Sequence, residues 1–206
     1  MLKLYFSPGS CALASHIALE EAGVAYTAER VDFKNGQQTT PEYLAINPKG
    51  RVPVLVTDRG VLTETPAILA YVAQSSSKAK LMPDDPFAFA LAQSFNSYLC
   101  STVHVNHAHK GRGPRWATEQ SSFDDMKRKV PDSMSAAFAL IERDMVKGPW
   151  VMGEQYTVCD GYLFTLTGWA EGDGVDMAKL PKVTAHRQRM SERPAVQRVL
   201  ADEKAA

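Results

Sequence analysis

The sequence lacks an excess of charge of either sign and lacks any long apolar run. Its 23 Lys and Arg residues match its 23 Asp and Glu residues, so the formal net charge at pH 7 is zero. Proteins that bind nucleic acid or anionic membranes usually carry a basic patch, and this balance indicates none. No segment approaches the ~18 consecutive apolar residues of a membrane-spanning helix. We therefore expect small-molecule substrates as partners, with no nucleic acid and no membrane.

Cysteine is also scarce, because the 206 residues include only Cys11, Cys100 and Cys159. An odd number of widely spaced cysteines fits neither a disulfide framework nor the paired ligands of a zinc site. The apolar opening, residues 1–6, is too short for a secretory signal peptide. These features predict a reducing, cytoplasmic location, and they leave a special role for one cysteine.

In the first third of the chain, segments with the residue pattern of a strand alternate with a segment whose apolar residues recur at helical spacing. Leu2–Phe6 and Tyr26–Phe33 read as strands, and apolar residues recur at helical spacing in Cys11–Ala22, which Gly23 ends. Strand, helix and strand at this length predict a βαβ unit.

A second group of elements follows a polar loop. Pro41–Ile46 predicts a short helix, and the turn residues 58–60 predict a hairpin between strands 52–56 and 61–62. Thr65 is expected to be the N-cap of the next helix, with a proline at its first position. The order of these elements is that of a thioredoxin-like α/β domain.

A polar, proline-containing stretch separates this part from an all-α second half. We expect a thioredoxin-like domain at residues 1–75, a linker at 76–86 and an all-helical domain at 87–206. Helices are predicted at 87–109, 118–146, 158–170, 183–191 and 195–202, with Pro131 either kinking or dividing the second of them.

Cys11 lies at the start of the first predicted helix, directly after a strand. Free N–H groups and the helix dipole favour a thiolate there, or a thiolate bound beside it. A Cys-x-x-Cys redox pair would need a second cysteine where the chain has Ala14, so an internal dithiol is excluded. Cys11 is then either a partner for an external thiol or a small buried apolar residue.

Several segments together resemble the bacterial beta-class glutathione transferases. They are Ser7–Cys11, Asn47–Leu55, Leu62–Thr65, Gly153–Asp160 and Arg193–Val196, and they span nearly the whole chain. The resemblance implies the glutathione transferase fold, glutathione as cosubstrate, no metal, and a homodimer.

The resemblance also implies where glutathione binds. The Val52-Pro53 step matches the family's cis-proline, and Val52 would meet the cysteinyl backbone of glutathione. Glu64 would pair with the γ-glutamyl ammonium, and Thr65 with the free N–H groups of its helix would hold the carboxylate. The implied glutathione-binding residues are Ser10, Cys11, Arg51, Val52, Pro53, Glu64, Thr65 and His104, and the implied catalytic residues are Cys11 and His104.

Three further contacts are left open by the sequence. The glycyl carboxylate of glutathione could meet Lys34 or Gln37, or neither. His104 is preferred over His109 as the histidine beside the thiol, although both could be surface residues. Trp169 either borders the electrophile pocket, as an aromatic residue does in related enzymes, or packs in the core.

A second motif concerns folding. Thr157 and Asp160 form a Ser/Thr-x-x-acidic capping box, while Gly161 leaves no apolar residue for a hydrophobic staple. Cys100 and Cys159 are expected to be structural. A metal site at the histidines is not favoured, because no cysteine or nearby carboxylate completes it.

The function expected from these features is a glutathione S-transferase that joins the glutathione thiolate to small electrophilic, largely apolar substrates in detoxification. Two alternatives remain: thiol–disulfide exchange through a mixed disulfide at Cys11, and a non-catalytic binding protein on the same fold. The physiological electrophile cannot be deduced from the sequence.

Overall fold

A four-stranded mixed sheet forms the centre of the first part of the chain. The computed structural model describes residues 1–205, apart from the side chain of Ser77. The strands are β1 (Leu2–Phe6), β2 (Tyr26–Arg30), β3 (Val54–Thr57) and β4 (Gly60–Thr63). Their order in the sheet is β2-β1-β3-β4, with β1 parallel to β2 and β3 antiparallel to both neighbours.

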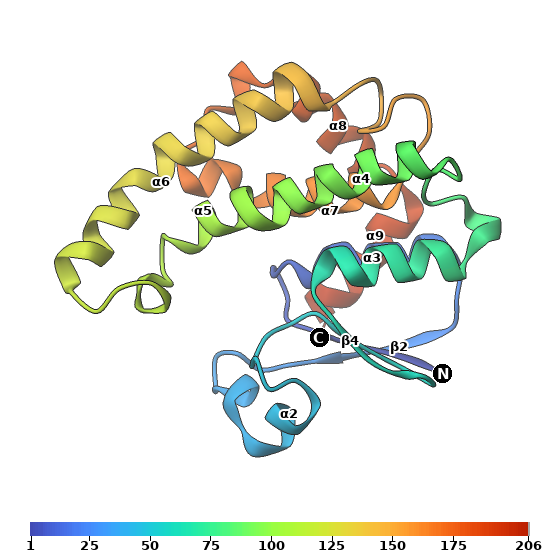
Figure 1. The fold of residues 1–206 in the computed structure, drawn as a ribbon, viewed down its shortest axis with the longest axis horizontal. Coiled ribbons are helices and arrows are strands. Elements are labelled where there is room, and N and C mark those ends of the chain that lie inside the picture. The colour runs from blue at the N-terminus through green and yellow to red at the C-terminus, as the bar shows by residue number, and fades with distance from the viewer. Residues whose placement is uncertain (206) are drawn as a thin grey trace.

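Three helices surround this sheet. Helix α1 (Ala12–Ala22) connects the parallel strands and ends at Gly23, whose φ of 64° is the left-handed conformation that glycine adopts readily. Helix α2 (Pro41–Ile46) and helix α3 (Thr65–Ser75) lie on opposite sides of the sheet in Figure 1. The predicted thioredoxin-like half is therefore confirmed.

The second half consists of helices, as predicted. They are α4 (Pro86–Tyr98), α5 (His104–Ala108), α6 (Gln120–Leu140), α7 (Val158–Ala170), α8 (Pro181–Ser191) and α9 (Pro194–Ala205). A π-helical turn at residues 99–103 makes α4 and α5 one continuous segment. Helix α6 runs through Pro131 without a break, so that proline does not divide it. No helix within residues 1–205 is long and apolar enough to cross a membrane.

Several element boundaries differ from the predictions by a few residues, and two of these differences have a clear local feature. Strand β2 ends at Arg30, because the Asp32 carboxylate accepts hydrogen bonds from the N–H groups of Lys34 and Asn35 (3.0 and 3.2 Å) and forms a turn. Thr65 is the first residue of α3 and not its N-cap; that position is held by Glu64, with a φ of 72°.

One hydrophobic core extends across both halves. It includes Leu4 and Leu69 from the first half together with Leu99 and Phe138 from the second, and all four are fully buried. Helix α1 packs against α7 at close range, since a Cβ at Gly161 would lie 3.3 Å from the Ile17 side chain. The division into residues 1–75, 76–86 and 87–206 remains a prediction, and its last residue lies outside the described chain.

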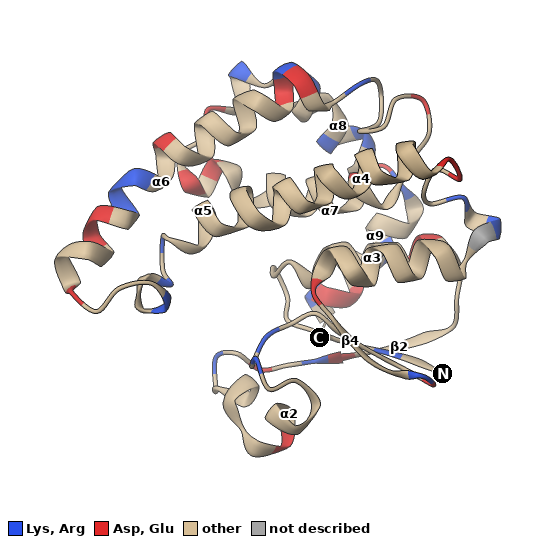
Figure 2. Cartoon of the chain, in the orientation of Figure 1, with Lys and Arg blue, Asp and Glu red and all other residues tan. Residues whose placement is uncertain are grey.

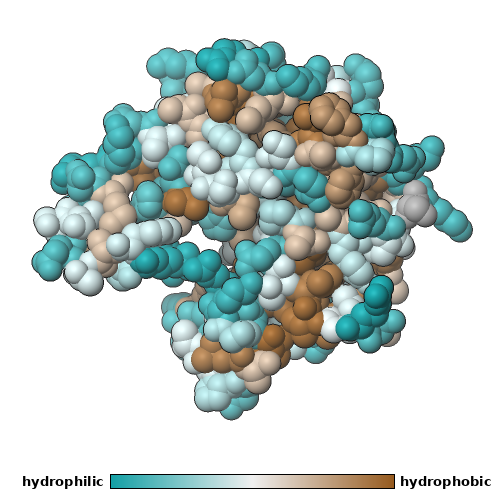
Figure 3. Space-filling model, in the orientation of Figure 1, coloured by the Kyte–Doolittle hydropathy of each residue, from teal (hydrophilic) through white to brown (hydrophobic). Residues whose placement is uncertain are grey.

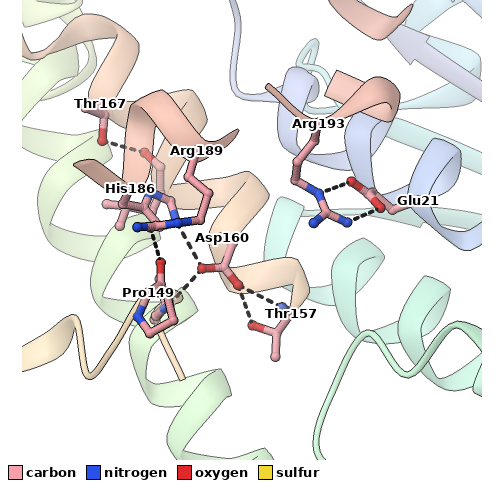
Figure 4. Close-up of polar contacts among 10 residues, drawn as sticks. Glu21, Pro149, Thr157, Asp160, Thr167, His186, Arg189 and Arg193 are labelled. Atoms are coloured by element: carbon pink, nitrogen blue, oxygen red, sulfur yellow. Dashed lines mark hydrogen bonds and ion pairs between the residues drawn. The ribbon is translucent and has the colours of Figure 1, made fainter. Parts of the chain in front are cut away.

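The buried carboxylate of Asp160 fixes the start of α7 (Figure 4). It accepts hydrogen bonds from the backbone N–H groups of Thr157 and Val151, each at 2.7 Å, and lies 2.9 Å from Nε2 of His186 on α8. The predicted capping box is confirmed. This one carboxylate therefore connects the start of α7 to the loop at Val151 and to α8.

Candidate functional site

A cleft of about 770 Å³ lies between the sheet half and the segment around α5. Figure 3 shows the hollow as a notch with hydrophilic edges, between the lobe that contains α2 and the arm formed by the loop after α5. The lining comes from parts of the segments 7–11, 33–39, 47–53, 63–65 and 100–116, with further contributions from α7.

All nine residues predicted for the site line this cleft. They are Ser10, Cys11, Arg51, Val52, Pro53, Glu64, Thr65, His104 and Trp169. The turn before α1, the bend before β3 and the start of α3 thus meet at one place, although they are far apart in the sequence. Lys34, Gln37 and His109 are not among the lining residues, and the Gln37 side chain instead accepts a hydrogen bond from the Asp32 N–H (2.7 Å).

Cys11 is the N-cap of α1, and its thiol is buried. Burial raises the pKa of the Cys11 thiol to about 11, and a hydrogen bond with Thr65 lowers it only in part. The Ser10 hydroxyl already accepts the first N–H of α1, from Ala12 at 3.2 Å. The thiol donates toward the Val52 carbonyl at 3.6 Å. Of the two possibilities that the sequence left open at this turn, the raised pKa of Cys11 favours a neutral cysteine that lies beside a bound thiolate.

The bend before β3 presents backbone to the cleft. The Val52–Pro53 peptide bond is cis, as predicted. The Arg51 carbonyl accepts hydrogen bonds from the Tyr43 hydroxyl and from Nδ2 of Asn47, both at 2.8 Å. These two contacts hold the bend in place and leave the Arg51 side chain free to face the cleft.

Glu64 and Thr65 lie where α3 begins. Glu64 is a non-glycine residue with positive φ, a conformation that costs on the order of 1–3 kcal/mol and is concentrated at functional sites. Its exposed carboxylate forms an ion pair with Lys49, whose ammonium also donates to the Thr63 hydroxyl at 2.7 Å. Thr65 is buried directly behind. The helix start combines free N–H groups with an adjacent acid, which suits a zwitterionic ligand.

His104 and Trp169 form the opposite wall. Burial lowers the pKa of His104 to about 4, with further lowering from the neighbouring His107, Arg115 and Arg51, so the imidazole is neutral at pH 7. The Trp169 indole donates to the Gly9 carbonyl at 3.1 Å. Trp169 lines the cleft and also packs against the buried core, and its place beside the electrophile remains a prediction.

Sequence reasoning missed a buried carboxylate behind this wall. Asp173 lies 2.6 Å from Nδ1 of His107 and 3.0 Å from the Lys110 ammonium, while His107 stacks on Trp169 with ring centroids 4.1 Å apart. The expectation that no carboxylate lies near the histidines is wrong. Asp173 is remote in the sequence, so no local pattern indicates the contact. The described residues hold no group of three side chains suited to a metal ion.

Cys100 was expected to be structural, yet it lines the cleft beside Tyr162. Burial raises the pKa of the Cys100 thiol as well. The other missed residues are cations on the loop after α5, Arg112 and Arg115. The only signal for them was the basic sequence Arg-Gly-Pro-Arg, which in isolation resembles an ordinary solvated loop.

A thioredoxin-like sheet joined to a helical half across one cleft, with a cis-proline in its wall, defines the glutathione transferase fold. The chain belongs to the glutathione S-transferase family: residues 1–74 match its "Glutathione S-transferase, N-terminal domain" and residues 99–194 its "Glutathione S-transferase, C-terminal domain".

Individual relatives resemble the chain over almost its whole length. Glutathione S-transferase GstA of Escherichia coli O157:H7 is 33% identical, over 98% of both chains. A glutathione transferase homolog from Sulfitobacter, crystallised with bound glutathione, is 50% identical over 98% of both chains, with a TM-score of 0.96. The beta-class enzyme of Sphingomonas chungbukensis is 32% identical over 99% of this chain and 100% of its own, with a TM-score of 0.85.

Proposed function

We propose that the protein is a glutathione S-transferase that binds glutathione in this cleft and directs its sulfur at an electrophilic carbon. The supporting observation is the convergence of the Cys11 turn, the Pro53 bend and the Thr65 helix start on one cleft. The Sulfitobacter homolog, crystallised with bound glutathione, supports the same ligand here.

Each part of glutathione has a chemically matching group in the cleft. The γ-glutamyl carboxylate would meet the N–H groups at the start of α3 and the Thr65 hydroxyl. The γ-glutamyl ammonium would take the Glu64 carboxylate, which in this structure is paired with Lys49. The cysteinyl backbone would pair with Val52 in the manner of an added strand.

The sulfur of glutathione would then lie between Cys11 and His104. The Cys11 thiol, neutral because its pKa is about 11, can donate a hydrogen bond to the developing thiolate. Neutral His104, with a pKa of about 4, is too weak a base to keep the proton that the thiol loses, so it can offer the sulfur a hydrogen bond from its ring N–H while the proton passes to water. The thiolate forms a bond to the electrophilic carbon, and the leaving group departs with its electron pair or the carbanion takes a proton from water.

Replacing Glu64 tests this proposal. Millimolar glutathione should raise the melting temperature of the wild-type protein, because a ligand that binds only the folded state stabilises it. Glu64→Ala should raise the dissociation constant of glutathione roughly 10- to 100-fold, because it removes one charged hydrogen bond. Glu42→Ala, an exposed acid on α2, is the control. Absence of any shift in the wild type would refute glutathione binding.

Thiol–disulfide exchange is less favoured. A nucleophilic cysteine needs its thiolate, and the buried Cys11 thiol with a pKa of about 11 is protonated at neutral pH. A non-catalytic binding protein is not favoured either, because Glu64, Thr65 and the Val52-Pro53 step all remain in the cleft.

We also propose a cytoplasmic homodimer with a role in detoxification, as the family resemblance implies. Phe87 and Leu91 lie one turn apart on α4 and are 73% and 50% exposed, an apolar pair that a second copy could cover. Sedimentation velocity tests this: Phe87→Glu with Leu91→Glu should shift the protein toward monomer. Leu200→Glu, at an exposed leucine on α9, should not.

A further inference from the structure

The residues that line the cleft carry more positive than negative charge. Five of its lining residues are Lys or Arg, and Glu64 is the one carboxylate among the lining residues in the described chain. Lys49 is paired with Glu64, and Lys110 with Asp173. The surplus therefore consists of guanidinium groups: Arg51, Arg112 and Arg115.

These three guanidiniums have no ion-pair or hydrogen-bond partner for their side chains within the described residues. Elsewhere in the chain most arginines are paired: Arg193 binds Glu21 through two hydrogen bonds, and Arg198 binds Glu20. A chain with zero net charge has carboxylates enough to pair these arginines as well. The cleft thus concentrates unpaired cations in a way that the composition does not require.

The three arginines line the cleft from two segments. Arg112 and Arg115 belong to the loop between α5 and α6, and Arg51 lies on the segment after α2. Figure 2 shows blue segments both on the loop after α5 and on the chain between α2 and the sheet. Burial and the charges of Arg51 and Arg112 lower the pKa of Arg115, while the nearby Cys11 raises it. Positive charge from both segments therefore lies near Arg115, which is also close enough to Cys11 for the two groups to interact electrostatically.

Glutathione does not neutralise this cluster by itself. The tripeptide carries two carboxylates and one ammonium. Its γ-glutamyl carboxylate has the start of α3, and its ammonium takes Glu64 away from Lys49, so the glycyl carboxylate alone is left for Lys49 and the three guanidiniums. Its single negative charge neutralises only one of these cations. At least one of Arg112 and Arg115 would remain unpaired beside the sulfur.

We propose that the second substrate of this enzyme is an anionic electrophile, whose carboxylate is held by Arg112 and Arg115 while its reactive carbon meets the glutathione sulfur. This inference rests on the proposed glutathione transferase function and replaces the largely apolar electrophile implied by the family resemblance. Trp116 and Trp169, which also line the cleft, provide aromatic surface for a planar or unsaturated carbon skeleton.

A matched pair of probes separates charge from shape. The first is a chlorodinitrobenzoate with chlorine para to the carboxylate, and the second is its neutral methyl ester. In both, the glutathione sulfur forms a bond to the chlorine-bearing carbon, the electron pair enters the nitro-activated ring, and chloride leaves with the C–Cl pair. The rate of each reaction is divided by its uncatalysed rate with glutathione, because the ester and the carboxylate differ in intrinsic reactivity.

The wild-type enzyme should accelerate the carboxylate at least tenfold more than the ester, and added salt should reduce this preference. Arg115→Gln should remove most of the preference, because it should lower kcat/KM for the carboxylate at least tenfold more than kcat/KM for the ester. Arg112→Gln should act in the same direction, and Arg115→Lys should retain part of the preference. Arg59→Gln removes the same charge from the exposed hairpin turn and should change neither rate.

Three outcomes would overturn the inference. If the wild-type enzyme accelerates the ester as much as the carboxylate, the cleft does not select an anionic substrate. Equal loss for both probes in Arg115→Gln, with a raised KM for glutathione, would assign Arg115 to the glycyl carboxylate. If neither probe reacts and glutathione leaves the melting temperature unchanged, the proposed function fails and this inference fails with it. Circular dichroism of each variant checks that the fold is retained.

Discussion

Cys11 illustrates how burial decides the chemistry of a single side chain. The thiol lies at a helix start, where free N–H groups usually stabilise a thiolate. In this protein Ser10 accepts the first of those N–H groups, and the surrounding core removes water from the sulfur. The loss of hydration outweighs the effect of the helix dipole, so the thiol is protonated at neutral pH, and we expect it to act as a hydrogen-bond donor.

Cys11→Ala should therefore have a modest effect on conjugation. Loss of one neutral hydrogen bond corresponds to about 0.5–1.5 kcal/mol, so kcat/KM for a chlorodinitrobenzene should fall roughly 2- to 13-fold. Steady-state assays with purified protein measure this. A loss of several hundredfold would mean that the sulfur does more than donate, and mass spectrometry for a mixed disulfide would then identify it as a nucleophile.

His104 gives a prediction about pH. Its pKa is about 4 in the folded protein against an ordinary 6.5, because burial and the charges of His107, Arg115 and Arg51 disfavour the imidazolium, while Glu64 partly offsets them. The unfolded chain takes up the proton first, so the free energy of unfolding should decrease as pH falls from about 6.5 to about 4.

Urea denaturation between pH 7 and pH 4 measures this slope. His104→Asn removes the titrating group and should flatten the curve. His109→Asn, at a histidine that does not line the cleft, should leave it as in the wild type. An unchanged slope in His104→Asn would assign the pH dependence to other groups.

At the scale of the element, the start of α7 depends on one carboxylate shared by three segments. Thr157, Val151 and His186 all direct a polar group at Asp160, which is fully buried (Figure 4). Removing that carboxylate leaves each of those groups without its partner, and an unpaired buried polar group costs about 1–3 kcal/mol.

Asp160→Ala should accordingly lower the free energy of unfolding by about 3 kcal/mol or more, measured by urea denaturation. Asp176→Ala is the matched control, because Asp176 caps a short helical turn through a single hydrogen bond to Ala178 at the surface. That variant should lose about 1 kcal/mol. Equal losses in the two variants would contradict the shared role of Asp160.

Local patterns predict elements well and contacts between them poorly. The capping box at Thr157 and the hairpin turn at residues 58–60 were predicted because their causes lie within a few residues. The contact between Asp173 and His107 joins residues far apart in the sequence, and the pKa of Cys11 depends on what covers it. Tertiary packing sets both, and no short motif encodes either.

At the scale of the whole molecule, the two halves share one hydrophobic core. Leu4 and Leu69 on the sheet side belong to the same buried cluster as Leu99 and Phe138 on the helical side. Neither half can lose its structure without exposing apolar surface of the other, at roughly 25 cal/mol per Å². The sequence predicted two domains, but it did not indicate that buried residues of both belong to one continuous hydrophobic cluster.

We therefore expect one unfolding transition. The three tryptophans lie in the second half and report its packing, while far-UV circular dichroism reports the helices and strands of both halves. The two probes should give the same urea midpoint, and the calorimetric and van't Hoff enthalpies should agree. Two separate midpoints would mean that the halves unfold independently.

The bond between the Trp169 indole and the Gly9 carbonyl has a consequence for chimeric proteins. The sheet half contains the groups proposed to grip the peptide, but a helix from the other half tethers the turn that precedes Cys11. A hybrid that exchanges the helical half for that of a relative without an aromatic donor at this position would keep the peptide contacts and lose the tether. Because Trp169 lines the cleft and also holds this turn, exchanging the helical half would change both the specificity for the electrophile and the alignment of the sulfur.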